Sequence, residues 1–157
     1  MTRRRFALHV DERPAEADAD KIKMGLRAFN EVRTGRPLNV RKFALWVKDG
    51  DGVIVGGLTG MTYWDWLYVD YLWLDEGLRR RGWGTRLIER AEHLGVARGC
   101  RGAWLDTFSF QAPGFYRRMG YREFGRMNDH PTGESRHFFW KPLAAKRQAS
   151  RTPARRR

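Results

Sequence analysis

The spacing of hydrophobic and polar residues along the chain predicts a mixed fold of short strands and amphipathic helices. Short apolar runs bounded by turn-forming residues are typical of strands. Such runs occupy residues 6–10, 42–48, 53–63, 67–74, 101–108, 121–126 and 137–141. The sequence Asp-Gly-Asp-Gly at 49–52 predicts a tight turn, so the second and third runs should form an antiparallel hairpin. The run at 67–74 is apolar on both faces, which predicts a central strand.

Three other segments have the period of amphipathic helices. The first is expected to be capped by Asp18 or Asp20 and to end at Gly35, with apolar residues on one face between them. The last should begin at Pro113, because proline suits a first helical turn where the N–H would be unpaired anyway. Gly120 is expected to end that helix.

The remaining helix follows a glycine-containing turn at 78–84 and ends near Gly99. It separates the central run at 67–74 from the run at 101–108. Two neighbouring strands that are joined through a helix must run parallel, because a short hairpin cannot connect them. The sequence therefore predicts an α/β (α+β) fold that contains one βαβ unit.

Composition suits one folded domain with a basic extension. The 157 residues are 41% hydrophobic and 13% aromatic, which excludes a disordered chain although the net charge is +13. Seven of those charges follow residue 140 without an acidic residue, and three more come from the arginines at 3–5. We therefore expect one domain over 1–143, a disordered basic tail over 144–157, and only weak, salt-dependent attachment of that tail to nucleic acid.

The sparse cysteine and histidine content limits the chemistry. Cys100 is the single cysteine and cannot form an internal disulfide, which suits a reducing cytoplasm. The four histidines lie at unrelated spacings, so no metal site is expected. No segment approaches the length of a membrane span, and no membrane partner is expected.

The turn before the second helix carries the clearest chemical signal. It reads Arg-Arg-Arg-Gly-Trp-Gly at 79–84, and glycines at such a turn let backbone N–H groups approach a ligand. Together with the positive end of the helix dipole, these N–H groups favour an anion. Two glycines alone fit a purely structural tight turn as well. Neither the Walker A nor the Rossmann glycine pattern is present.

The chain resembles the GNAT acyltransferase superfamily at two motifs. The first is Arg or Gln, two residues, Gly, one residue, then Gly or Ala, which Arg79, Gly82 and Gly84 match. The second is Tyr, three residues, Gly and an aromatic residue, which begins here at Tyr116. The resemblance extends over residues 6–143 in element order. It implies a mixed, mostly antiparallel central sheet with a parallel strand pair at the cofactor crevice, flanked by helices.

The resemblance also implies site residues and a co-substrate. The co-substrate would be acetyl-CoA, with its pyrophosphate held by the turn, its pantetheine arm paired with the end of the central strand, and its thiolate protonated by Tyr116. The cofactor-binding candidates are Leu72, Trp73, Leu74, Arg79, Arg80, Arg81, Gly82, Trp83, Gly84, Thr85, Ser109 and Gln111. Where the family often has an asparagine, this chain has Ser109, which is also a candidate cap of the third helix.

Amine acetylation also needs a group that accepts a proton. Strand alternation places Asp70 on one face with Tyr68, Leu72 and Leu74, which makes Asp70 the candidate general base. Glu76 is the alternative base. Each candidate also has a structural interpretation: Asp70 in an ion pair with an arginine, and Tyr116 as a packing aromatic. Asp106 could equally orient substrate or pair with an arginine.

These observations predict a cytoplasmic N-acetyltransferase that moves an acetyl group from acetyl-CoA directly to a primary amine of a small molecule or peptide. A homodimer is compatible with this interpretation. The alternative is a non-catalytic module on the same fold, which binds acyl-CoA or uses its basic tail to bind nucleic acid or an acidic partner. Fold alone does not separate these alternatives, because function depends on the site.

Overall fold

The computed structural model describes residues 6–143. These residues form two compact units that divide between Leu38 and Asn39, and each unit is described by itself. The prediction of one domain over 1–143 stays a prediction. The predicted basic tail, 144–157, lies outside the described residues.

The first unit contains one helix, α1 (Glu16–Thr34), which ends at Gly35 in a left-handed conformation with φ 64°. Residues 6–10 have no regular secondary structure, so the strand predicted there is wrong. A short apolar run shows no strand preference of its own, because a strand depends on a partner for its hydrogen bonds.

The predicted start of α1 is also wrong, because the helix begins earlier. Ala15 is its N-cap residue, and the Ala15 carbonyl accepts hydrogen bonds from the N–H groups of Asp18 and Ala19. Asp18 instead lies in the first turn, where its negative charge complements the positive end of the helix dipole. The carboxylate of Asp18 pairs with Lys21 at 2.8 Å rather than with a backbone N–H.

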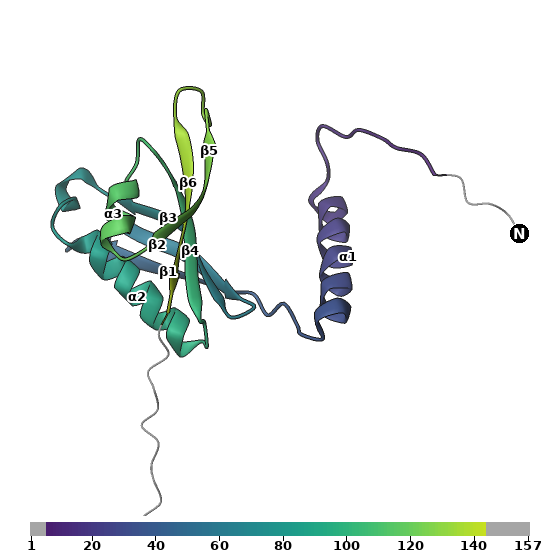
Figure 1. Cartoon of the computed structure of the whole chain (residues 1–157), viewed down its shortest axis with the longest axis horizontal. Helices are drawn as coiled ribbons and strands as arrows, with labels where there is room; N and C mark the ends of the chain where they lie inside the picture. Colours follow the sequence, from purple (N-terminus) through teal and green to yellow (C-terminus); the bar gives the residue numbers. More distant parts are fainter. Residues whose placement is uncertain (1–5, 144–157) are drawn as a thin grey trace, which may run out of the picture. The chain divides into compact units, whose positions relative to one another are not determined.

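The second unit is built on one six-stranded sheet in the order β1-β2-β3-β4-β6-β5 (Figure 1). Its strands are β1 (Arg41–Lys48), β2 (Ile54–Tyr63), β3 (Trp66–Leu74), β4 (Gly102–Phe108), β5 (Arg122–Asn128) and β6 (Ser135–Pro142). All neighbours are antiparallel except β3 and β4, which are parallel. The predicted mixed sheet and its parallel pair are confirmed.

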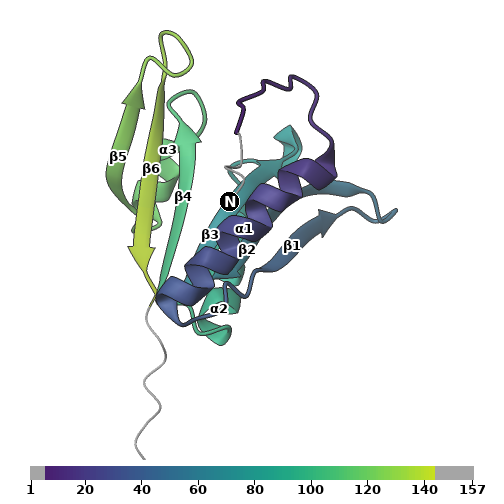
Figure 2. The same cartoon turned by 90° about the vertical axis from the view of Figure 1, so that its right-hand side faces the viewer.

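Two helices and one 3-10 turn complete this unit. They are η1 (Glu76–Leu78), α2 (Trp83–Ala97) and α3 (Pro113–Arg118). Helix α2 connects β3 to β4 as the predicted crossover, and α2 and α3 lie on the same side of the sheet in both views (Figures 1 and 2). Within residues 6–143, no helix is both long and apolar enough to cross a membrane.

The core fills the space between the sheet and these two helices. Ile88 and Ala91 of α2 are fully buried, as are Leu67 of β3 and Phe139 of β6. Tyr116 of α3 belongs to the same buried cluster. The core thus fixes α2 and α3 over the parallel strand pair, where the site is found.

Candidate active site

The two parallel strands pair over only part of their lengths. Their register runs from Trp66 opposite Gly102 to Val69 opposite Leu105. Beyond these residues β3 continues to Leu74 on its own. The edge of β3 at 70–74 therefore faces a gap instead of β4, and its backbone groups on that side have no ladder partner in β4.

A bulge in β3 occurs at the point where the strands separate. Tyr71 pairs with Thr59 of β2 and Val69 pairs with Gly60, which leaves Asp70 as the extra residue. Such a residue shifts the alternation of all later side chains by one position. Leu72 accordingly packs against the same core as Val69.

One sequence prediction is corrected by this bulge. Tyr68 does not share a face with Leu72 and Leu74, because the regular alternation ends at Asp70. Leu72 and Leu74 pack against the core, whereas Tyr71 and Trp73 are exposed. The hydrophobic pattern could not reveal the bulge, since it is defined only by the register with β2.

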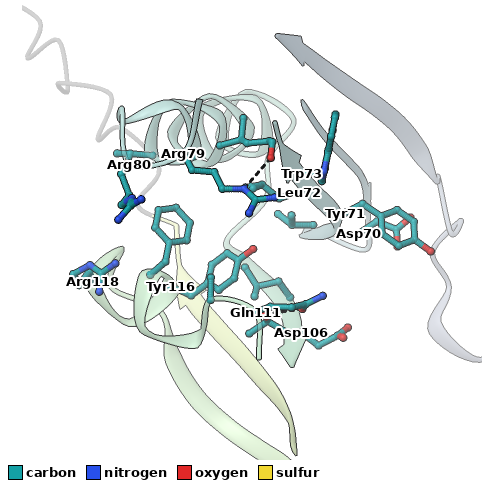
Figure 3. A pocket seen from close by; sticks show the side chains of 18 of the residues that line it. Asp70, Tyr71, Leu72, Trp73, Arg79, Arg80, Asp106, Gln111, Tyr116 and Arg118 are labelled. Atoms are coloured by element: carbon teal, nitrogen blue, oxygen red, sulfur yellow. Dashed lines mark hydrogen bonds between the residues drawn. The ribbon is translucent and has the colours of Figure 1, made fainter. Parts of the chain in front are cut away.

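A cleft of about 750 Å³ opens between the separated strands. Figure 3 shows side chains from β3, the turn before α2, β4 and α3 converging on it. The predicted site residues that line it are Asp70, Leu72, Trp73, Leu74, Arg79, Arg80, Gly82, Gly84, Thr85, Gln111 and Tyr116. Arg81, Trp83, Ser109 and the alternative base Glu76 are not among the lining residues. The lining thus brings most of the predicted residues together.

The start of α2 supplies unpaired backbone donors to this cleft. Gly82 is the N-cap residue in a left-handed conformation with φ 81°, which suits glycine because it has no Cβ. The first intrahelical hydrogen bond runs from the N–H of Arg86 to the carbonyl of Gly82, at 3.1 Å. The N–H groups of the three residues before Arg86 therefore have no carbonyl partner within the helix, and they can bind an anion.

Cationic side chains surround the same turn. Nε of Arg79 donates a hydrogen bond to the carbonyl of Leu74 at 3.1 Å, which ties this side chain to the end of β3. Arg80 lines the cleft as well, and so does Arg118 of α3 (Figure 3). Sequence reasoning missed Arg118, because the motif that begins at Tyr116 leaves its three intervening residues unspecified and the position of Arg118 depends on how α3 packs.

Gly84 and Trp83 have packing roles that the sequence did not show. A Cβ atom on Gly84 would lie 3.3 Å from the ring of Phe115, so glycine allows close approach of α2 and α3 and a larger side chain would push this ring aside. Trp83 packs against the core, and the guanidinium carbon of Arg86 lies 4.2 Å from its ring centroid. A bulky residue at 84 would therefore disturb packing as well as any bound anion.

Tyr116 is buried at the side of the cleft, with 8% of its surface exposed. Its ring contacts those of Phe115, Tyr121 and Phe139, with centroids 5.0, 6.1 and 6.3 Å away. The hydroxyl group points into the cleft (Figure 3). Burial, and secondly the negative charge of Asp106, raise the pKa of Tyr116 to about 12, so the phenol keeps its proton at neutral pH.

Ser109 and Gln111 take part in hydrogen bonds that hold the end of β4. The amide oxygen of Gln111 accepts from the hydroxyl of Thr107 and from the N–H of Phe108, each at 2.9 Å. The hydroxyl of Ser109 accepts from the N–H of Ser135 at 2.9 Å and donates to Glu134.

The suggestion that Ser109 caps α3 is wrong. The N-cap residue of α3 is Ala112, which makes no side-chain capping hydrogen bond. Ser109 instead ties the end of β4 to the start of β6, because its hydroxyl is engaged by Ser135 and Glu134.

The opposite side of the cleft is acidic. Asp70 and Asp106 both line it, and they lie away from the three arginines (Figure 3). Asp106 pairs with Nε of Arg136 at 2.6 Å, so the arginine partner considered for Asp106 is present. Burial, and then the charges of Asp106 and Asp70, raise the pKa of Tyr68 to about 12.

The fold and the cleft are those of an acyltransferase: a βαβ crossover places a helix N-terminus, a free strand edge and a buried phenol around one gap. The family model described as "Acetyltransferase (GNAT) family" matches residues 9–121. This chain belongs to that family and is an N-acetyltransferase. Acetyl-CoA is the acetyl donor of GNAT acetyltransferases.

Several known proteins are similar to the chain over most of their length. Blasticidin-S acetyltransferase from Streptomyces morookaense is 42% identical, over 79% of this chain and 92% of that protein. Acetyltransferase Atu2258 from Agrobacterium fabrum is 34% identical, over 77% of this chain and 88% of that protein. An acetyltransferase from Bacillus cereus, known from a crystal structure, is 39% identical in sequence to this chain. The two structures superpose over 86% of this chain and 98% of the Bacillus cereus chain, with a TM-score of 0.78.

Proposed function

We propose that this chain transfers the acetyl group of acetyl-CoA directly to a primary amine of a small molecule. The observation that carries the proposal is the hydroxyl of the largely buried Tyr116, which points into the cleft between the free edge of β3 and the N-terminus of α2. A small-molecule acceptor is favoured over a protein because blasticidin-S acetyltransferase is 42% identical to the chain. A reducing, cytoplasmic location is part of this proposal and suits the free, buried Cys100.

The cleft fits acetyl-CoA in charge and in shape. The N–H groups at the start of α2 and the side chains of Arg79 and Arg80 suit the pyrophosphate, because they combine backbone donors with positive charge. We assign Arg81 and Trp83 to this site through their backbone alone. The backbone of β3 at 72–74 has no β4 partner toward the gap, where it can pair with the pantetheine amides and polarise the thioester carbonyl. The carbonyl of Leu74 already accepts a hydrogen bond from Nε of Arg79.

The proposed reaction is a direct displacement in which the donor supplies an activated acetyl group. The neutral amine nitrogen attacks the thioester carbonyl carbon, so a C–N bond forms and the C–S bond breaks. Tyr116 donates its proton to the departing sulfur as negative charge develops there. Cys100 lies outside the cleft lining, and burial raises the pKa of its thiol, which disfavours an acetyl-cysteine intermediate.

Asp70 is the proposed acceptor of the amine proton, directly or through a water molecule. It occupies the bulge where β3 leaves β4, and it lines the acidic side of the cleft. Glu76 is less well placed, since it lies in η1 and outside the cleft lining. The carboxylate of Asp70 also favours an amine that arrives as a cation, since Asp106 is already paired with Arg136. Such an amine must lose its proton before it can attack.

Asp70→Asn should lower kcat by about 10²-fold at neutral pH, because general-base help is typically worth about 10²–10⁴-fold. The loss should shrink as the pH rises toward about 10.4, the usual pKa of an alkylamine, because the free amine then no longer needs a base. The kcat of both enzymes would be measured across this range. A loss that is independent of pH would contradict the role of base.

The activity is tested by following free thiol released from acetyl-CoA with a panel of amines. We expect release with blasticidin S or a related small amine, and much less with a lysine-containing peptide. Mass spectrometry of the product should show one added acetyl group. Tight acetyl-CoA binding without thiol release from any amine would instead support a non-catalytic binding module.

A further inference from the structure

We propose that the ion pair between Arg117 and Glu123, called the α3 clamp below, is a positioning device for Tyr116. The clamp holds α3 against the sheet so that the phenol stays in the cleft. This inference rests on the proposed role of Tyr116 as general acid and adds the residues that keep it in place.

Helix α3 needs an anchor because it is very short. It spans six residues, Pro113–Arg118, and its N-cap residue makes no side-chain hydrogen bond. Isolated helices of this length are unstable in water, since few hydrogen bonds compensate for the ordering of the backbone. Contacts with the sheet must therefore determine where α3 and Tyr116 lie.

The clamp attaches the residue next to Tyr116 to the strands beneath it. One terminal guanidinium nitrogen of Arg117 lies 2.6 Å from a carboxylate oxygen of Glu123 on β5. Glu123 is opposite Phe139 of β6 in the strand register. The guanidinium carbon of Arg117 lies 5.4 Å from the ring centroid of Phe139, the same ring that packs against Tyr116. Arg117 and Tyr116 are thus held by the same strand pair.

Glu123 accepts hydrogen bonds from two arginines and lies beside a buried histidine. Besides Arg117 of α3, Arg126 of β5 lies 2.9 Å away and Nδ1 of the buried His137 of β6 lies 3.2 Å away. Burial alone would raise the pKa of Glu123, but its contacts with Arg117, the nearby His137 and Arg126 outweigh burial and lower the pKa to about 2. Glu123 therefore stays charged at neutral pH, and Arg117 connects it to α3.

If the ion pair only stabilised the fold, its loss would lower thermal stability rather than kcat. The side chains of Arg117 and Glu123 are 47% and 23% exposed, and pairs this accessible contribute little to stability. Displacement of a catalytic group by about 1 Å can nevertheless cost up to about 10²-fold in rate. The clamp should therefore matter more for turnover than for thermal stability or for acetyl-CoA binding.

Arg117→Gln should lower kcat about tenfold while KM for acetyl-CoA changes less than about twofold, because the turn before α2, proposed to hold the pyrophosphate, is untouched. Arg117→Lys should recover most of the rate, since it keeps the charge. The matched control is Arg126→Gln, which removes a donor from the same carboxylate without detaching α3. Equal kcat values for Arg117→Gln and Arg126→Gln would overturn the proposal.

A double variant distinguishes a role in positioning Tyr116 from a general disturbance of the fold. In a Tyr116→Phe background, Arg117→Gln should cause no further loss of kcat, because the phenol it positions is gone. A full tenfold loss in that background would overturn the clamp as a device for Tyr116.

A separate result would show that Tyr116 is not the general acid: the Tyr116→Phe variant would then have the same kcat as the wild-type enzyme. In that case hydrogen exchange of the α3 amides decides whether the clamp anchors the helix. Faster exchange in Arg117→Gln than in Arg126→Gln would support the anchor, and equal exchange would overturn it.

Discussion

Tyr116→Phe should lower kcat by about 10²–10⁴-fold and leave the affinity for acetyl-CoA nearly unchanged. The ring remains to pack against Phe115, Tyr121 and Phe139, so only the hydroxyl in the cleft is lost. Because the pKa of Tyr116 is raised to about 12, the phenol is protonated in the wild-type enzyme well above neutral pH. The deficit should therefore persist unchanged up to about pH 10, where an ordinary phenol begins to ionise.

Steady-state kinetics over this pH range and calorimetry with acetyl-CoA are the measurements. The matched control is Tyr63→Phe, the same change at the end of β2 and outside the cleft lining, which should leave kcat unchanged. Normal turnover by Tyr116→Phe at every pH would show that the proton comes from solvent or from another residue. Tyr116 would then be a packing residue.

Gly82→Val should weaken acetyl-CoA binding by about 10²-fold. A side chain at this position extends into open space at the cleft, because no heavy atom lies within 4 Å of a Cβ atom built there. It would obstruct approach to the N–H groups of α2, and loss of two hydrogen bonds to a charged group, at about 1.5 kcal/mol each, gives about this factor. Gly82 is the better test position than Gly84, since a Cβ at 84 would meet Phe115.

A control is needed because the left-handed backbone at Gly82, with φ 81°, is strained for any other residue. Gly99 follows the other end of α2 with φ 83° and equally open space. Gly99→Val should therefore cost similar stability, of about 1–2 kcal/mol or somewhat more for a β-branched side chain, without affecting acetyl-CoA binding. Thermal unfolding of both variants measures the loss of stability, and calorimetry measures the affinity for acetyl-CoA. Equal affinities of Gly82→Val and Gly99→Val for acetyl-CoA would argue against a pyrophosphate site at the turn.

Much of the fold could be predicted because its signals are local. The Asp-Gly-Asp-Gly turn predicted the hairpin of β1 and β2, and the helix between two apolar runs predicted the parallel pair β3 and β4. Pro113 marked the start of α3 correctly. The strand at 6–10 was wrong, because a strand depends on a partner that the local sequence does not specify. The cap of α1 was wrong because the helix already begins after Ala15, and Asp18 pairs with Lys21 inside its first turns.

The sequence by itself determined the turn before α2, because its glycines and the amphipathic segment that follows them are local features of the chain. Only the tertiary structure decided which way β3 faces beyond Asp70, since the bulge is a property of the register with β2. The ion pairs of Asp106 with Arg136 and of Arg117 with Glu123 were likewise decided by packing. Each joins residues from different elements, and the periodicity within one element carries no information about such contacts.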